Sequence, residues 1–363
     1  MILKLFCVWR LSLFLVTYLG SLLLPKIANS GVGAIGEGKQ FDFWASWAQW
    51  DGGHFYNIAQ RGYVLESDFA FMPLYPQLVK FLNPLFGGNL IWTGLIISNL
   101  AFLLFLWLFF KWQQEKFGQK IAYTSLVTFL VFPTTFFAVA FYSEGFFLLL
   151  VVIFFLFLEK KNYLAAILAG SAASITRLTG LFLVLAFIYS YLVNIKLNVK
   201  RIINLVFYLA IALLPIILWI ISLFIVSGDL WKFVAVQSLW QREIQDPLST
   251  IFGYFWAFVS GQNRPLNDYF DWGLAMLFLS TLILGIKKIP SSLWIFSMLA
   301  ILIPASTGTL TSMPRYLLAS IGAFVIIGQF LVEHQKLRLT IWTAALFIQA
   351  ILATLFVNGY WVA

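Results

Sequence analysis

Long apolar runs separated by short polar segments dominate the chain. The runs approach the 17–25 residues that a helix needs to cross a hydrocarbon core, and residues 202–226 contain no charged side chain. This pattern predicts eleven transmembrane helices, with boundary errors of a few residues. They are expected at residues 5–24, 91–110, 121–138, 143–158, 162–177, 179–194, 202–226, 269–286, 291–305, 316–332 and 339–357. The first run lacks a small-residue cleavage site, so we interpret it as a retained helix rather than a signal peptide.

Composition indicates the same class of protein. Of the 363 residues, 62% are hydrophobic and only 10% are charged, whereas soluble domains average about 45–50% apolar and about 25% charged residues. The predicted fold class is therefore an all-α polytopic membrane protein, with residues 1–363 forming a single integral membrane domain. Cys7 is the only cysteine, and His54 and His334 are the only histidines. We therefore predict no disulfide, no metal site and no cofactor.

The distribution of charge predicts how the chain crosses the membrane. With a cytoplasmic N-terminus, 14 of the 23 Lys and Arg residues, including Arg10, fall on the cytoplasmic side with only three of the 14 acidic residues. Basic residues in short loops favour the cytoplasm, so this orientation is the predicted one. The net charge of +9 is then a topology signal, and no nucleic-acid partner is expected.

This orientation leaves two large extracytoplasmic loops, at residues 25–90 and 227–268. Trp44, Trp47 and Trp50 follow one another at three-residue spacing in the first loop. Aromatic-rich amphipathic helices lie along the membrane interface. We expect both loops to rest on the bilayer, where they would suit a substrate that carries a lipid tail.

The first loop also contains the densest polar cluster, which includes Asp51, His54 and Arg61. A carboxylate near an apolar interface can have its pKa raised by desolvation, which suits a general base that takes a proton from a hydroxyl. Asp is also a favoured helix N-cap. Both interpretations of Asp51 stay open, and they can coexist. Two interpretations are also open for Glu144: it stabilises a helix N-terminus, or it lines an acceptor pocket.

Three arginines stand on the outer side, where basic residues are disfavoured. They are Arg177, Arg242 and Arg315, the last followed by Tyr316. Charges near membrane depth are costly and face a cavity or a partner, and arginine matches phosphate oxygens with a bidentate fork. Each one alone could pair with a carboxylate or reach the lipid headgroups. Three on one side of the membrane favour a phosphate site.

At these residues the sequence resembles the PIG-V-like mannosyltransferases, membrane glycosyltransferases of the GT-C class. Five stretches carry the resemblance, in the family's order. They are residues 50–63 (WDGGHFYNIAQRGY), 69–76 (FAFMPLYP), 132–144 (FPTTFFAVAFYSE), 176–180 (TRLTG) and 312–317 (SMPRYL). The chain is short beside the eukaryotic enzyme that adds the second mannose of the GPI anchor, which suggests a bacterial relative in the plasma membrane.

The resemblance implies a GT-C-like fold with an acidic residue in the first outer loop, here Asp51. It implies a polyprenyl-phosphate-linked mannose as donor and an inverting transfer to a hydroxyl at the extracytoplasmic face. Asp51 would deprotonate the acceptor, and Arg315, Arg177 and Arg242 would neutralise the leaving phosphate. His54 would orient Asp51 or bind a sugar hydroxyl. The resemblance requires no metal.

Two other classes of function stay open from the residues alone. A lipid-linked-sugar transporter or flippase would also be polytopic, although such proteins often carry internal repeats, and we find none. A non-catalytic partner subunit would keep the fold without the chemistry. The acceptor also stays open between a glycan, a glycolipid and a protein.

Overall fold

The computed structural model describes residues 1–27, 41–193 and 198–362. Part of the predicted loop 25–90 and the end of the predicted span 179–194 therefore lie outside the described residues. Every regular element within the three ranges is a helix, which confirms the all-α class. The chain divides into two compact units. Unit 1 holds Met1–Leu149 and Gly328–Val362, and unit 2 holds Leu150–Ile327.

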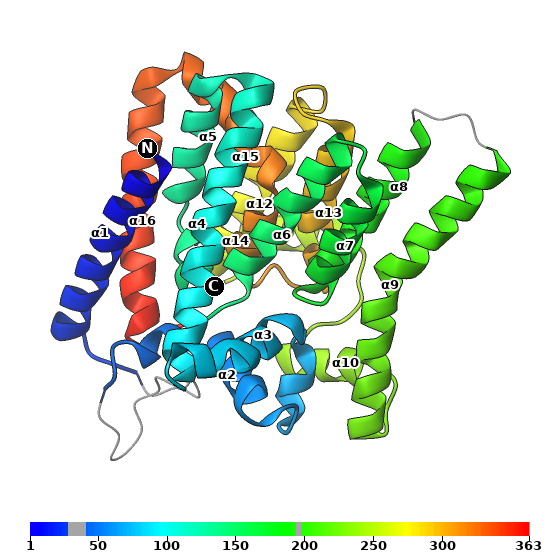
Figure 1. Ribbon diagram of the computed structural model, residues 1–363. Helices are drawn as coiled ribbons and strands as arrows, with labels where there is room; N and C mark the ends of the chain where they lie inside the picture. The colour runs from blue at the N-terminus through cyan, green and yellow to red at the C-terminus, as the bar shows by residue number, and fades with distance from the viewer. Residues whose placement is uncertain (28–40, 194–197, 363) are drawn as a thin grey trace. The chain divides into compact units, whose positions relative to one another are not determined.

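Unit 1 rests on two pairs of packed helices. Helix α1 (Ile2–Leu23) lies along α16 (Gln335–Val357), and α4 (Leu90–Phe117) lies along α5 (Gln119–Leu130) (Figure 1). The predicted loop 25–90 folds into short helices between α1 and α4. They are η1 (Ala45–Ala48), α2 (Asp51–Arg61), η2 (Glu66–Ala70), α3 (Leu74–Leu82) and η3 (Asn83–Phe86).

The predicted span 121–138 is wrong at its C-terminal end, because α5 stops at Leu130. The residue before Pro133 is disfavoured in helical conformation, and the hydroxyl of Thr135 donates to the carbonyl of Phe129 at 2.6 Å. Gln349 of α16 donates to the carbonyls of Leu130 and Phe132 at 3.1 and 2.7 Å. The chain then continues through the buried turn η4 (Thr135–Val139) to α6 (Glu144–Glu159).

The charge count assigned Arg10 to the cytoplasmic side, although the residue falls within the predicted span 5–24. It stands in the interior of α1, where its Nε donates to Asn99 Oδ1 at 3.0 Å. Its guanidinium carbon lies 4.8 Å from the ring centroid of Trp47 in η1. A charge within an apolar helix is tolerated when it faces a polar partner inside the protein. Without Arg10, 13 basic residues and three acidic ones are still assigned to the predicted cytoplasmic side, so the orientation is still predicted.

Unit 2 contains the end of α6 and the following helices up to Ile327. These are α7 (Tyr163–Ser174), η5 (Leu178–Phe182), α8 (Leu183–Val193), α9 (Val199–Ser227), α10 (Lys232–Ala235), η6 (Val236–Trp240), α11 (Pro247–Val259), α12 (Leu266–Leu284), α13 (Ser291–Ala305), α14 (Met313–Tyr316), η7 (Leu317–Ala319) and most of α15 (Ile321–Glu333). Its core forms around α13, which packs against α8, α11, α12 and α14.

The predicted span 316–332 is not one straight helix. Met313–Ala319 and Ile321–Glu333 meet at 84°. Ser312, which precedes the first segment, has a positive φ of 67°. The bend turns the segment that carries Arg315 away from the axis of α15.

Four helices of the described residues are long and apolar enough to cross a membrane: α1, α4, α9 and α16. The bent pair would add a fifth. These helices support an integral membrane protein, since each has at least the roughly 20 residues that a span requires. The total of eleven spans and the interfacial position of the loop helices remain predictions.

Candidate active site

Asp51, in the motif at residues 50–63, is at the start of a helix. Trp50 is the N-cap of α2, so Asp51 is the first helical residue rather than the cap. Its half-buried carboxylate therefore lies at the positive end of the helix dipole, which favours a negative charge. Trp50 has a φ of 54°, a conformation that costs energy outside glycine and that often occurs at functional sites.

Close packing fixes the position of this helix start. A Cβ on Gly52 would lie 3.1 Å from both the carbonyl oxygen of Phe141 and Cε2 of Tyr142. The hydroxyl of Tyr142 donates to the carbonyl of Gln49 at 2.8 Å, and the N–H of Phe141 donates to the carbonyl of Trp47 at 3.0 Å. The structure therefore brings the motif at 50–63 together with the motif at 132–144.

Glu144 closes the second of these motifs. It is the first residue of α6 and is only 2% exposed. An acidic side chain at this position stabilises the helix N-terminus, as the sequence suggested. Gly145 allows the close packing, since its Cβ would clash with the backbone oxygens of Ala138 and Ser98. The turn of chain that follows Tyr142 thus holds a second carboxyl group inside unit 1.

His54 has a partner that the sequence analysis missed. Its Nδ1 lies 2.9 Å from Oδ1 of Asp68, which is fully buried in η2. The second oxygen of Asp68 accepts from the N–H of Leu65 at 3.1 Å. The ring of His54 also stacks on Phe71, with centroids 4.6 Å apart. Carboxylate and stacked ring together fix the orientation of the imidazole, as in sites where a second group orients a functional histidine.

The motif at 69–76 supports the same region, because it leads into α3, which packs against α2. Tyr75 is fully buried, and its hydroxyl lies 2.8 Å from the hydroxyl of Ser98 and donates to the carbonyl of Gly94 at 3.1 Å. Burial raises the pKa of Tyr75, the hydrogen bond with Ser98 opposes the shift, and the charge of Glu144 adds to it. Tyr75 is therefore a neutral anchor for α3 against α4 at any physiological pH.

Arg61 is not brought next to Asp51. It is an exposed residue in the last turn of α2. Ten residues of helical rise, roughly 15 Å, separate it from the first residue of that helix. A cation in the last turn interacts favourably with the helix dipole, and the binding of substrate by Arg61 stays a prediction.

The three outer arginines converge on one ring in unit 2. The guanidinium carbons of Arg177, Arg315 and Arg242 lie 5.7, 5.8 and 5.9 Å from the ring centroid of Tyr316. Nη2 of Arg242 also donates to the hydroxyl of Tyr316 at 2.9 Å. These distances are in the range of cation–π contacts. Three guanidinium groups gathered around one half-buried ring suit the binding of an anion. We call these four residues the arginine cluster.

Three separate breaks in helical structure build the arginine cluster. Arg177 stands between α7 and η5, where the chain turns so tightly that a Cβ on Gly180 would collide with the backbone of Ala173. Arg242 follows Gln241, whose φ is 55°. Arg315 is 4% exposed and lies in α14, one turn after Ser312. The predicted break between two short apolar helices around Arg177 is confirmed.

A further carboxylate supports this region. Asp271 is buried in α12 and accepts a hydrogen bond from the backbone N–H of Ser312. This hydrogen bond helps to hold Ser312, the residue of positive φ that precedes α14. The sequence held a signal for Asp271, because an acidic residue inside the predicted span 269–286 is costly unless it has a partner within the protein. This signal was not used in the prediction of the site. Within the three described ranges, no group of three or more His, Cys, Asp and Glu side chains is arranged to hold a metal ion.

Comparisons with known proteins identify the family and the fold of the chain. The family described as Mannosyltransferase (PIG-V) matches residues 1–227. No curated protein matches the chain. Among solved structures, the chain is similar to ArnT from Cupriavidus metallidurans bound to undecaprenyl phosphate, with a TM-score of 0.54 and 15% identity. The match covers 89% of this chain and 59% of that one.

The apo structure of the same ArnT gives a TM-score of 0.52 at 15% identity, covering 89% of this chain and 58% of that one. At such low identity the likeness shows the fold, which is GT-C-like. The chain spans less than two thirds of the length of these structures. The family match covers more than half of the chain, and the chain therefore belongs to the mannosyltransferase (PIG-V) family of membrane glycosyltransferases.

Proposed function

We propose that the protein transfers a mannosyl residue from a polyprenyl-phosphate-linked donor to an acceptor hydroxyl at the extracytoplasmic face of a bacterial plasma membrane. The arginine cluster carries this proposal. Its three guanidinium groups surround one aromatic ring, and a guanidinium matches phosphate oxygens with a bidentate fork. ArnT, which has a similar fold, was solved with undecaprenyl phosphate, which supports a lipid phosphate as the ligand.

The proposed reaction is a single displacement with inversion. The acceptor oxygen forms a bond to the anomeric carbon while the bond between that carbon and the phosphate oxygen breaks. The electron pair leaves with the polyprenyl phosphate, and the acceptor proton passes to the carboxylate of Asp51. The arginine cluster stabilises the charge that develops on the phosphate. The leaving phosphate is a stable anion, so no general acid is required.

The other candidate residues take supporting roles in the proposal. His54, oriented by Asp68, binds a sugar hydroxyl, and Glu144 lines the acceptor side. We propose that both units serve this reaction as one membrane domain. Transport and a purely structural role are the competing functions, and the family match makes both less favoured.

Replacement of Asp51 tests the base. Asp51→Asn keeps the size of the side chain and removes its basicity, so kcat should fall by roughly 10²–10⁴-fold, the usual contribution of general base catalysis. The assay follows radiolabelled mannose from undecaprenyl-phosphate mannose to acceptors in proteoliposomes. Asp42→Asn is the matched control, because Asp42 is exposed in the same loop and accepts from the N–H of Trp44. A wild-type rate in Asp51→Asn would exclude Asp51 as the base.

A further inference from the structure

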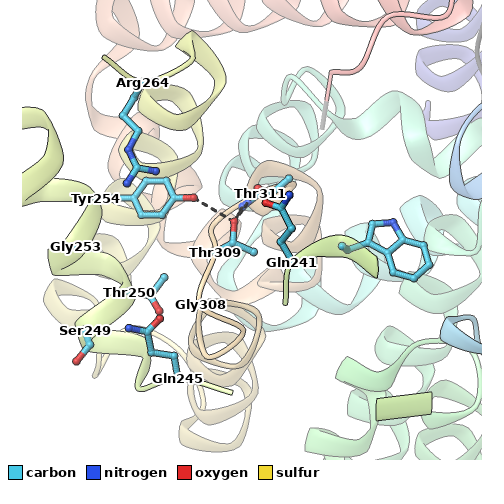
Figure 2. A pocket seen from close by; sticks show the side chains of 11 residues that line it. Gln241, Gln245, Ser249, Thr250, Gly253, Tyr254, Arg264, Gly308, Thr309 and Thr311 are labelled. Carbon is cyan, nitrogen blue, oxygen red and sulfur yellow. Dashed lines mark hydrogen bonds between the residues drawn. The ribbon is translucent and has the colours of Figure 1, made fainter. Parts of the chain in front are cut away.

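A cavity of about 320 Å³ opens in unit 2 between α11 and the chain that follows α13 (Figure 2). Its volume lies at the lower end of the range for small-molecule sites, roughly 300–1,000 Å³. The side chains that define its chemistry are those of Trp240, Gln241, Gln245, Thr250, Tyr254 and Thr309. They combine two primary amides, three hydroxyl groups and an indole.

The hydroxyl groups form a connected wall. The hydroxyl of Tyr254 lies 3.2 Å from Oγ1 of Thr309, which lies 2.8 Å from Oγ1 of Thr311. The N–H of Leu310 donates to the hydroxyl of Tyr254 at 3.2 Å. Figure 2 shows Tyr254 and Thr309 pointing toward one another beside Gln241. Each hydroxyl can both donate and accept, so this wall matches a ligand that itself carries hydroxyl groups.

The cavity has little net charge to offer a ligand. Among the described side chains that line it, only Arg264 is ionised. Its Nη1 lies 3.3 Å from Oδ2 of Asp268, and its guanidinium carbon lies 5.2 Å from the ring centroid of Tyr254. A charge that is paired with a carboxylate and a ring attracts a further anion only weakly. The lining therefore favours a neutral, hydroxyl-rich molecule.

Backbone hydrogen bonds keep the cavity in shape. The N–H groups of Glu243 and Gln245 donate to the carbonyls of Thr307 and Ser306 at 3.1 and 2.9 Å. Gly308 has a φ of 75°, and a Cβ there would lie 3.1 Å from Oε1 of Gln245. A larger residue at 308 would be strained and would crowd that amide. The site is thus preformed, which reduces the entropic cost of binding.

The cavity and the arginine cluster share two segments of chain. Gln241 lines the cavity, and the next residue, Arg242, donates to Tyr316. Thr311 also lines the cavity, four residues before Arg315. We infer that the cavity binds a sugar ring of a glycan or glycolipid acceptor beside the donor phosphate. This inference rests on the proposed function and names its acceptor as a glycoside rather than a peptide.

Direct sugar binding tests the inference separately from catalysis. Saturation-transfer NMR on the full chain in nanodiscs measures binding of methyl α-mannoside, methyl β-glucoside, methyl β-galactoside and methyl N-acetyl-β-glucosaminide. At least one should bind saturably, and inorganic phosphate should not displace it. Binding of none of the four, or displacement by phosphate, would overturn the inference. If a glycoside binds but wild-type protein transfers no mannose, the proposed function fails while the sugar site stands.

Two variants locate the sugar. Gly253 lines the cavity and a Cβ there meets no atom within 4 Å, so Gly253→Leu fills space without displacing the wall. It should weaken glycoside binding by at least tenfold and leave binding of undecaprenyl phosphate unchanged. Gly273→Leu is the matched control, because Gly273 is also an open helical glycine but does not line the cavity.

Thr309→Val serves as the milder variant, because it keeps the shape and removes one hydroxyl of the wall. One lost hydrogen bond of about 0.5–1.5 kcal/mol corresponds to roughly two- to tenfold weaker glycoside binding. Unchanged glycoside affinity in both Gly253→Leu and Thr309→Val would place the sugar elsewhere and overturn the inference.

Discussion

At the scale of single residues, the contacts of Arg242 in the arginine cluster predict that a lysine would be a poor replacement for it in donor binding. Arg242 uses Nη2 for the hydroxyl of Tyr316 and Nη1 for Oε1 of Gln237, at 2.9 and 3.3 Å. A lysine ammonium is a point charge that cannot hold both acceptors and a phosphate in one plane. Arg242→Lys should therefore raise KM for undecaprenyl-phosphate mannose about tenfold, measured by initial rates in proteoliposomes.

The control for this prediction is Arg338→Lys. Arg338 also lies over an aromatic ring, with its guanidinium carbon 5.3 Å from the centroid of Trp342, but it belongs to α16 and not to the arginine cluster. It should leave the donor KM within twofold. Equal effects of the two substitutions would mean that Arg242 acts through general charge and not through the geometry of its site.

At the scale of elements, the start of α2 depends on a glycine. A Cβ at Gly52 would lie 3.1 Å from the oxygen of Phe141 and from the ring of Tyr142, so Gly52→Ala must move the helix by a few tenths of an ångström. Small displacements of catalytic groups reduce rates strongly, and we expect kcat to fall about tenfold while the protein still folds.

Gly273→Ala provides the comparison, since Gly273 lies in α12 with open space around its Cα. Gly→Ala at an unstrained helical position stabilises a protein by about 0.4–1 kcal/mol, which thermal unfolding in detergent would detect. Its kcat should match that of the wild type. A Gly52→Ala variant with full activity would show that α2 tolerates the displacement.

At the scale of the whole molecule, the orientation in the membrane is a prediction that labelling can test. Cys7 is the only cysteine, so Cys7→Ala provides a background without thiols. Gln262 and Lys287 are exposed on either side of α12, whose 19 residues span roughly 28 Å. A membrane-impermeant maleimide should label Gln262→Cys in intact cells and Lys287→Cys only after permeabilisation.

Labelling of both positions from outside would show that α12 does not cross the membrane, and the count of eleven spans would fall. Labelling of Lys287→Cys alone would reverse the predicted orientation and place the arginine cluster on the cytoplasmic side. In that case the donor would have to be presented from the other leaflet.

The sequence alone determined the features that depend on local composition. Apolar runs of sufficient length predicted α1, α9 and α16 within a few residues, because hydropathy is a property of neighbouring residues. They also predicted the start of α4, but this helix continues to Phe117, seven residues beyond the predicted end of the span at residue 110. The N-cap interpretation of Asp51 predicted the start of α2 to within one residue, and five ordered motifs identified the family. Arg177 marked a break between helices because a charge interrupts an apolar run there.

Tertiary structure decided which distant residues meet. Local patterns could not pair His54 with Asp68 or bury Arg10 against Trp47, since each contact depends on packing against another segment. The arginine cluster draws on residues 65 and 73 positions apart, and the cavity beside it exists only where α11 meets the chain after α13. Side chains far apart in sequence come together only in the folded chain, and hydropathy, which describes neighbouring residues, cannot predict these contacts.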